Sequence, residues 1–247
     1  TALIEAKAGD VVRLLAGRYG LDGGVSLDVS GVTVRGAGPG KTILDFTGQQ
    51  GEGEGLLITG NDVLVRDLAV ENAKGNGIKS KGSDGVSFVN LRVEWTGGPK
   101  ATNGAYGVYP VSSRNVLIDR VTVKGASDAG IYVGQSANII VRASHAEQNV
   151  AGIEIENSYN ADVIGNTATN NAGGILVFDL PDLPQQGGHS VRLAGNKVLA
   201  NNHVNFAAPG NIVASVPSGT GIMVMANRNV HVIGNEITGN QGNAVMI

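Results

Sequence analysis

The side chains of this chain that could do chemistry recur at a nearly constant interval. Tyr109, Tyr132 and Glu154 follow one another at steps of 23 and 22 residues, and Lys79 stands 30 residues before Tyr109. Phenols, carboxylates and an ammonium group provide acids, bases and a cation. If the interval is structural, these side chains share one face. A long ligand lying along the molecule would then meet them in order.

The same interval marks a sequence repeat, in which a glycine and an apolar residue precede the position of interest. Its members are Gly107-Val108-Tyr109, Gly130-Ile131-Tyr132, Gly152-Ile153-Glu154 and Gly174-Ile175-Leu176. A repeat of this length with short strands and no helical pattern is one coil of a solenoid. The sequence therefore predicts an all-β, single-stranded parallel β-helix of about nine to ten coils, forming one domain over residues 1–247.

Departures from the interval predict insertions and an end cap. Gly77-Ile78 precedes Gly107 by 30 residues, which assigns about eight extra residues to Thr96–Ala105. Gly221 follows Gly174 by 47 residues, which predicts two coils plus a short second insertion in Phe178–Gly188 or in Ala207–Gly219. Residues 2–6 resemble the end of a helix that would cap the first coil. We expect part of this cap, and any export signal with it, to be missing.

Composition excludes several classes of partner and cofactor. The net charge of −3 with no basic run argues against nucleic acid, and no stretch is long and apolar enough to span a membrane. Without cysteine there is no disulfide, thiolate catalysis or sulfur-ligated metal. The four histidines lack metal-ligand spacing, so no metal site is expected. Calcium remains the one possible cofactor, because the acidic loop Asp179–Asp182 could bind it through oxygen ligands.

Strand alternation predicts which side chains point outward. Ile131 and Ile153 face the core, so Tyr132, Glu154 and Glu156 are expected to face solvent. Outward positions of successive coils form columns about 4.8 Å apart per coil. The first column reads Lys79, Tyr109, Tyr132, Glu154, Leu176, and its neighbour reads Val111, Gly134, Glu156, Phe178. The turn before the strand adds Asp128 and Asn149 to this face.

Each of these residues also has a purely structural interpretation. Tyr109 and Tyr132 suit a half-exposed sheet because tyrosine favours strands. Lys79, Glu154 and Glu156 could be ordinary solvated charges. The recurring asparagines are expected to be structural, since their amides bond to turn backbone or to the amide one coil away.

Three stretches carry a resemblance to a known family, and it covers the whole chain. They are residues 103–111 (NGAYGVYPV), 125–136 (GASDAGIYVGQS) and 150–157 (VAGIEIEN). The chain resembles the right-handed parallel β-helix repeat proteins of the pectate-lyase superfamily, and within it an uncharacterised bacterial branch. The resemblance implies a right-handed coil and export to the periplasm or the cell exterior. The superfamily includes lyases, hydrolases and C5-epimerases of acidic polysaccharides.

One segment resembles the epimerase motif Tyr-Gly-Phe-Asp-Pro-His only in part. Residues 106–111 match its Tyr, Gly and Pro, but Tyr109 replaces the Asp and Val111 replaces the His. The paired-Asp motifs of polygalacturonase-like hydrolases and the Arg-centred motif of pectate lyases are absent. The resemblance therefore implies a carbohydrate-directed surface without specifying its reaction.

Three functional hypotheses follow. In the first, the protein removes a proton beside the carboxylate of an acidic polysaccharide, with Lys79 neutralising that carboxylate and Tyr109 or Tyr132 acting as base and donor. In the second, Asp128 and Glu154 hydrolyse a glycosidic bond. In the third, a non-catalytic solenoid binds a glycan or a partner protein along its face.

The surroundings of the column are expected to bind the ligand. The insertions Thr96–Ala105 and Phe178–Gly188 should flank the column as loops. Aromatic side chains near them would then line the walls of a groove, and a further carboxylate would contact the sugar hydroxyls. The residues predicted to bind substrate are Tyr106, Trp95, Phe178 and Glu156.

Overall fold

The computed structural model describes residues 2–247, and nearly all of its regular structure is strand. In chain order the elements are α1 (Ala2–Glu5), β1 (Val11–Arg13), β2 (Gly17–Gly20), β3 (Val25–Leu27), β4 (Thr33–Arg35), β5 (Thr42–Asp45), β6 (Leu56–Ile58), β7 (Val63–Glu71), β8 (Ile78–Lys81), β9 (Asp84–Glu94), β10 (Val108–Val111), β11 (Arg114–Lys124), β12 (Ala129–Gly134), β13 (Ala137–Arg142), β14 (His145–Glu147), β15 (Ala151–Glu156), β16 (Tyr159–Ile164), β17 (Thr167–Thr169), β18 (Gly173–Phe178), β19 (His189–Ala194), β20 (Lys197–Leu199), the 3₁₀ helix η1 (Ile212–Ser215), β21 (Thr220–Met225), β22 (Arg228–Ile233), β23 (Glu236–Thr238) and β24 (Val245–Met246).

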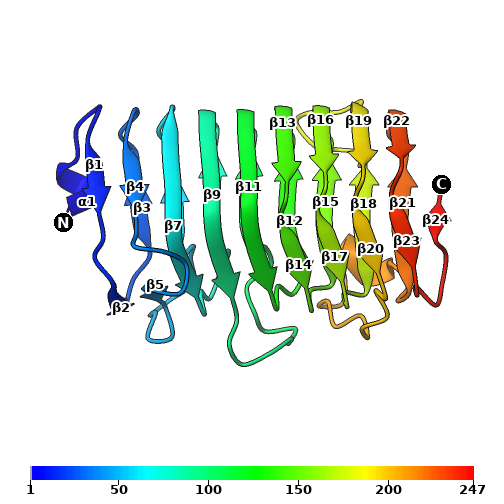
Figure 1. Cartoon of the computed structure of the whole chain (residues 1–247), viewed down its shortest axis with the longest axis horizontal. Helices are drawn as coiled ribbons and strands as arrows, with labels where there is room; N and C mark the ends of the chain where they lie inside the picture. The colour runs from blue at the N-terminus through cyan, green and yellow to red at the C-terminus, as the bar shows by residue number, and fades with distance from the viewer. Residues whose placement is uncertain (1) are drawn as a thin grey trace.

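The strands stack as a parallel β-helix, which confirms the predicted architecture (Figure 1). One sheet has nine strands in the order β24-β21-β18-β15-β12-β10-β8-β6-β3, one from each coil. We call it the narrow sheet. The other has 15 strands and is called the wide sheet. Nine coils agree with the predicted nine to ten.

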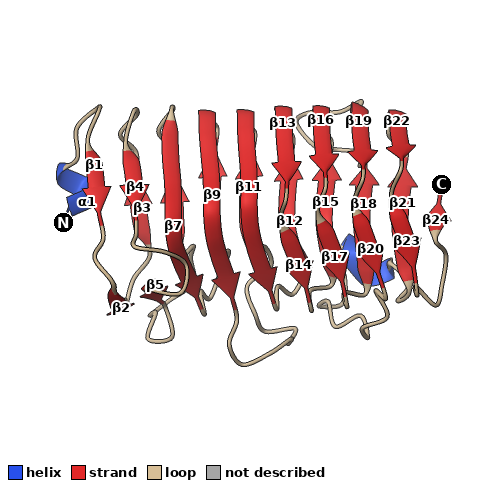
Figure 2. Cartoon of the chain, viewed as in Figure 1, coloured by secondary structure: helices blue, strands red, loops and turns tan. Residues whose placement is uncertain are grey.

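The wide sheet bends around a corner of each coil. In β7, β9 and β11 one long strand continues through the corner, and β11 pairs with both β13 and β14. Later coils break there into two strands, as Figure 2 shows. The bend is made by residues with left-handed backbone, such as Asn90 (φ 53°) and Gly165 (φ 62°). The coil therefore has flat faces joined by sharp turns.

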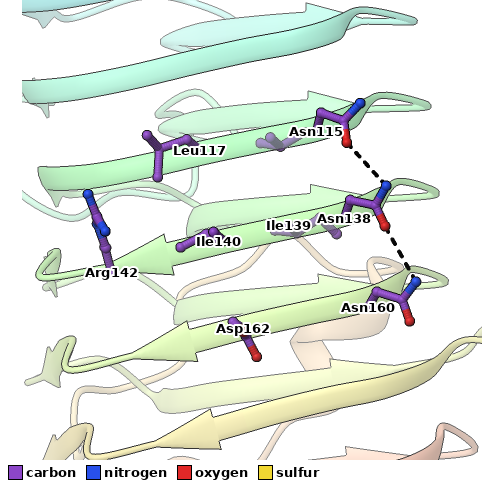
Figure 3. Close-up of a pocket in the computed structure, with 9 residues that line it drawn as sticks. Asn115, Leu117, Asn138, Ile139, Ile140, Arg142, Asn160 and Asp162 are labelled. Carbon is purple, nitrogen blue, oxygen red and sulfur yellow. Dashed lines mark hydrogen bonds between the residues drawn. The ribbon is translucent and has the colours of Figure 1, made fainter.

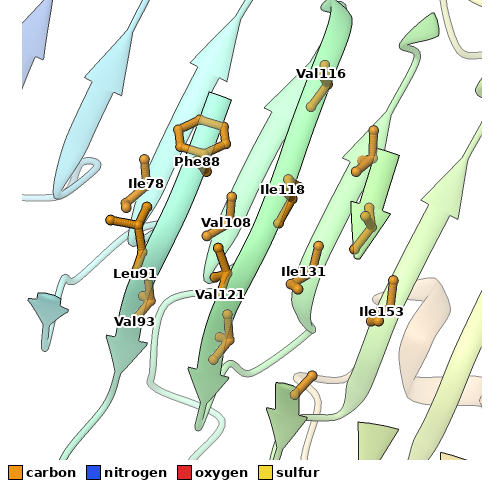
Figure 4. Close-up of a cluster of buried hydrophobic side chains, with 14 of the residues drawn as sticks. Ile78, Phe88, Leu91, Val93, Val108, Val116, Ile118, Val121, Ile131 and Ile153 are labelled. Carbon is orange, nitrogen blue, oxygen red and sulfur yellow. The ribbon is translucent and has the colours of Figure 1, made fainter. Parts of the chain in front are cut away.

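On the narrow sheet, the core contains a column of mostly β-branched residues, each stacked on its counterpart in the next coil. Ile78, Val108, Ile131 and Ile153 lie in register on successive strands and are fully buried (Figure 4). Close packing also explains the repeated glycine before them. A Cβ at Gly107 would lie 2.6 Å from the carbonyl oxygen of the next coil's glycine and would collide with a valine side chain. The prediction that Ile131 and Ile153 face the core is confirmed.

Buried asparagines form ladders along the molecule, as predicted. The Nδ2 of Asn171 donates to Oδ1 of Asn201 at 2.9 Å, and Asn149 donates to Asn171 at 3.1 Å. A second ladder joins Asn166, Asn196 and Asn235. Each amide also bonds to backbone, so every polar atom of the turn has a partner.

Insertions interrupt several coils, the first of them between β3 and β6, where the paired residues Val25 and Leu56 are 31 positions apart. The 47 residues from Gly174 to Gly221 form one coil and not the predicted two, because Ile175 pairs directly with Ile222. Both ranges considered for the second insertion contain extra residues: one loop spans 179–188 and another spans 200–219, with η1 inside it. In Figure 1 the loops at 96–105 and 200–219 lie at one end of the narrow sheet's strands, and 179–188 lies at the other. The helix expected at residues 2–6 is present as α1. No helix of the described chain is both long and apolar enough to cross a membrane.

Candidate functional site

The predicted column of side chains exists on the outer face of the narrow sheet. Lys79 pairs with Tyr109, and Tyr132 pairs with Glu154, which pairs with Leu176. The neighbouring column of Val111, Gly134, Glu156 and Phe178 is also in the predicted register. The spacing of the repeat therefore identifies which side chains share this face.

The prediction that these side chains face solvent is wrong. Only 4% of Tyr132 and of Glu154 is exposed. The rings of Tyr106 and Tyr109 pack against Tyr132, and the insertion 200–219 packs on the same outer face of the sheet. Its Val213 and Val216 belong to an outer apolar cluster, separate from the core. The buried members of that cluster are Ala129, Tyr132, Val150, Ala151, Ala172, Leu176, Phe178, Val213 and Val216.

Three tyrosine rings form one aromatic group beside this cluster. The ring centroids of Tyr106 and Tyr132 are 4.4 Å apart, and those of Tyr109 and Tyr132 are 4.9 Å apart. Tyr106 and Tyr109 remain partly exposed. The ring of Tyr132 lies over Gly134, where a Cβ would be 2.5 Å from the hydroxyl oxygen. The Tyr132 hydroxyl can therefore reach Glu156, to which it donates a hydrogen bond of 2.5 Å.

Three carboxyl groups surround the tyrosines, and we call Asp128, Glu154 and Glu156 the carboxyl cluster. Burial, and then the charge of Glu156, raises the pKa of Asp128 to about 7, although interaction with Tyr106 opposes this. Burial and the neighbouring carboxylates raise the pKa of Glu154 well above its usual value. Burial also raises the pKa of Glu156. Burial therefore favours the protonated form of all three groups.

Glu154 has a buried carboxyl oxygen whose hydrogen-bonding capacity is unsatisfied. Its Oε2 is buried and has no hydrogen-bond partner. A buried polar atom without a partner costs about 1–3 kcal/mol. Such a cost is typical of positions kept for binding or catalysis rather than for stability.

The lowered phenol pKa that a tyrosine base would need is not provided by the surroundings of the three tyrosines. Burial raises the pKa of Tyr106, Tyr109 and Tyr132, and nearby carboxylates raise it further. The phenols are therefore neutral near pH 7 and can only donate protons. Lowering a phenol's pKa would require a cation free of other partners.

Lys79 is not such a cation. Its Nζ lies 3.0 Å from Oε1 of Glu54 and 5.0 Å from the ring centroid of Tyr109. Oε2 of Glu54 in turn accepts hydrogen bonds from the backbone and side-chain nitrogens of Asn76, at 2.9 and 2.8 Å. Sequence reasoning missed Glu54 and Asn76. The signal was present, since Asn76 directly precedes the Gly77-Ile78 repeat and lies 22 residues after Glu54.

Two aromatic residues predicted to line the groove lie elsewhere or are covered. Trp95 belongs to the core, with 5% exposed, and its Nε1 donates to the carbonyl of Ala73 at 2.7 Å. Phe178 is in the expected column but is 1% exposed because the outer apolar cluster covers it. Asn149, which was expected on this face, is fully buried in its ladder. Trp95 and Asn149 point into the solenoid, so neither can contact a ligand on the outer face.

The flanking loops lie where they were predicted, at the two ends of the narrow sheet's strands. Loop 96–105 reaches the carboxyl cluster, because the Asp128 amide donates to the Ala105 carbonyl at 3.0 Å. In loop 179–188, Leu180 packs against the outer apolar cluster. The carboxylate of Asp179 accepts the amides of Gly187 and Gly188, so it closes this loop. Among residues 2–247, no group of three His, Cys, Asp or Glu side chains is arranged to hold a metal ion.

A larger shallow depression lies on the wide sheet, away from these groups (Figure 3). It has a volume of about 500 Å³ and is bordered by the exposed ladder of Asn115, Asn138 and Asn160. These amides already bond to one another, as the dashed lines show. The carboxylate of Asp162, which also lines the depression, is already paired with Arg192, so the narrow sheet is the better candidate.

Comparison with known proteins identifies the fold. A model of the right-handed β-helix region matches residues 28–182 and 81–247. No curated protein sequence matches the chain.

Solved structures with a similar backbone include enzymes that act on polysaccharides. One is the A-module of the mannuronan C-5 epimerase AlgE4 of Azotobacter vinelandii, at 13% identity over 92% of this chain and 88% of that one, with a TM-score of 0.43. An alginate lyase from Paenibacillus sp. str. FPU-7 is 18% identical over 100% of this chain and 95% of that one, with a TM-score of 0.47. The catalytic domain of a GH87 α-1,3-glucanase is 13% identical over 93% of this chain and 64% of that one, with a TM-score of 0.44. At these identities the likeness concerns the fold alone.

Proposed function

The chain belongs to the right-handed β-helix family, and on that premise we propose that its tyrosine and carboxyl groups bind and modify an acidic polysaccharide. The observation that carries the proposal is the carboxyl cluster beside three neutral phenols, all on one face of the narrow sheet. Acid and base groups with raised pKa values are typical of sites that transfer protons near pH 7. Tyrosine rings also suit the faces of sugar rings.

The reaction we propose begins with proton removal beside the sugar carboxylate. Asp128, whose pKa is about 7, takes the C5 proton in its ionised form. Glu154, neutral because it is buried, donates a hydrogen bond to the sugar carboxylate and so favours the carbanion. These roles replace those predicted for a tyrosine base and for Lys79.

Tyr132 supplies the second proton. In elimination, the electron pair left by the C5 proton forms the C4–C5 double bond, the C4–O bond breaks, and the leaving oxygen takes the phenol proton. In epimerisation, the phenol gives its proton to the opposite face of C5 and no bond of the chain breaks. Because the phenol is neutral at pH 7, it can serve either step.

Glycoside hydrolysis is the second candidate, and the same two carboxyl groups favour it. Asp128 and Glu154 both have raised pKa values, so either could protonate the leaving oxygen. If Glu154 is the acid, Asp128 or Glu156 would activate water or attack the sugar. If Asp128 is the acid, Glu156 would take that role. A solenoid that binds a glycan or a partner protein without changing it is the third candidate. Polysaccharides are encountered outside the cytoplasm, so the proposal implies export to the periplasm or the cell exterior.

A reaction screen separates the candidates. The purified protein would be incubated with alginate, pectate and neutral glucans across pH 5–9, with the Asp128→Asn protein as a matched inactive control. A lyase gives ultraviolet absorbance from unsaturated ends, a hydrolase gives shorter chains without it, and an epimerase changes only the monomer ratio. Turnover of an acidic polymer should rise with pH through about 7, as Asp128 ionises. If every polymer stays unchanged, the enzymatic proposal is wrong.

A further inference from the structure

A second cavity lies beside the candidate site, at the C-terminal ends of strands β10 and β12. Its volume is about 250 Å³, and its lining includes Ser112, Arg114 and Gln135 from the coils and Pro184 and Gln185 from loop 179–188. The loop therefore supplies one wall and the solenoid supplies the other. No Asp or Glu lines the cavity.

The wall formed by the loop is held in place by hydrogen bonds. The Nε2 of Gln185 donates to the carbonyls of Ser136 and Asn157, at 3.1 and 2.7 Å. The Nδ2 of Asn157 donates to the carbonyls of Leu180 and Gln185, both at 2.8 Å. A ligand would therefore find the cavity already formed and would not have to order the loop.

Arg114 makes the cavity positively charged. Over the part of the chain that the structure describes, no carboxylate lies within ion-pair distance of its guanidinium, whereas Lys79 is paired with Glu54. The planar guanidinium matches the two oxygens of a carboxylate, and the side chains of Ser112 and Gln135 add neutral donors. The cavity therefore has the chemistry of an anion site.

The cavity is also next to the carboxyl cluster. The amide of Gln135 donates to the carbonyl of Glu156 at 2.9 Å, and the amide of Ser112 donates to that of Gly134 at 3.0 Å. Lys81, which pairs with Val111 on the adjacent strand, adds a second exposed cation at this edge. A ligand crossing the outer face would thus contact the acidic groups and the cationic cavity together.

We propose that the cavity at Arg114 binds the carboxylate of a uronate unit neighbouring the unit that reacts. This inference rests on the function proposed above and names the residues that select an acidic polymer. An anionic polymer approaching the carboxyl cluster is repelled by any carboxylate that is ionised. Arg114 lies two coils before Glu156 and three residues beyond that side chain's register position, Val111. A guanidinium there offsets the repulsion, so Arg114 determines specificity without taking part in the chemistry.

The test compares Arg114→Gln with Arg13→Gln, which removes an exposed arginine on β1 at the far end of the wide sheet. Both proteins and the parent would be titrated calorimetrically with oligogalacturonate, with the same oligosaccharide after reduction of its carboxyl groups, and with a sulfated glycan. We expect Arg114→Gln to weaken oligogalacturonate binding at least tenfold and to leave binding of the reduced oligosaccharide unchanged. Arg13→Gln should bind all three as the parent does.

Two results would overturn the assignment while leaving the proposed function intact. In one, Arg114→Gln binds and turns over uronate polymers like the parent. In the other, the substitution affects only the sulfated glycan, which would make the anion a sulfate.

A separate readout covers the case in which no polymer is turned over. Free galacturonate would be titrated while the Nε–Hε resonance of Arg114 is followed by nuclear magnetic resonance. A saturable shift that the Nε–Hε resonance of Arg13 does not share supports the anion site even if the proposed function fails. An unchanged resonance overturns it.

Discussion

The hydroxyl of Tyr132 donates a hydrogen bond to Oε1 of Glu156, which stands one coil further on and in the neighbouring column. The bond crosses the face diagonally because Gly134, opposite Glu156, leaves room for the ring. It joins the aromatic group to the carboxyl cluster. A proton donor is thereby held at a fixed place beside two further acids.

Replacing Tyr132 by phenylalanine should impair function and stability together. We expect glycan turnover or affinity to fall at least tenfold, which is about 1.4 kcal/mol. Because Oε1 of Glu156 loses its donor in a buried place, unfolding should also become easier by about 1–3 kcal/mol. The control is Tyr159→Phe, which removes a hydroxyl bonded to the Gln186 carbonyl on an exposed surface. Equal turnover in the two proteins would show that Tyr132 has no functional role.

Asp128 should make the protein less stable as pH rises from about 4 to 7. The folded state keeps the proton up to about pH 7, while the unfolded chain loses it near the usual value of 3.8. The stabilising effect of this proton is complete below pH 3.8 and is lost as pH rises through 7, at no more than about 1.4 kcal/mol per pH unit. Urea unfolding across this range should show a smaller slope for Asp128→Asn. The same slope in both proteins would mean that Asp128 is not protonated when folded.

Replacing Ile153 by aspartate tests whether this position of the repeat faces the core. Ile153 is fully buried between Ile131 and its counterpart in the next coil, so a carboxylate there has no partner. We expect a loss of about 4 kcal/mol or more. Ile140→Asp makes the same change on the wide sheet's outer face, where 40% of the side chain is exposed, and should cost little. Similar melting temperatures for the two variants would contradict the assigned register.

Replacing Asn171 by alanine tests the buried ladder. The change removes the acceptor for Asn149 and the donor to Asn201, and it leaves both groups buried. We expect unfolding to become easier by about 1–3 kcal/mol. Asn138→Ala in the exposed ladder should change the free energy of unfolding by less than about 0.5 kcal/mol, because water replaces the lost amide. Chemical denaturation of both variants gives the comparison.

Spacing alone was enough to predict what repeats in this molecule. Ile131 and Ile153 had to stack because a period of 22 residues returns the chain to the same face, and the columns of Tyr132 and Glu156 followed from the same register. Trp95 could also have been placed correctly. It follows Leu91 and Val93 at alternate positions of the same extended segment, and both of those side chains face the core.

What could not be predicted depends on parts of the chain that do not repeat. The outer face is covered by the loop 200–219 and by the packed rings of Tyr106 and Tyr109, and strand alternation carries no information about such a cover. The ion pair of Lys79 with Glu54 comes from a turn of an early, irregular coil. The raised pKa values of the phenols follow from burial, and the free cation that could have lowered one of them is absent because Lys79 is paired.

The buried asparagine ladders also bear on how this molecule can evolve. Consecutive amides of one ladder are separated by 22 residues between Asn149 and Asn171, by 30 between Asn171 and Asn201, and by 39 between Asn201 and Asn240. The amide contacts hold the same geometry although the chain between them nearly doubles in length. Loops can therefore be lengthened, shortened or exchanged at the turns without shifting any coil. A new ligand preference could arise through loop exchange alone, with the inherited scaffold unchanged.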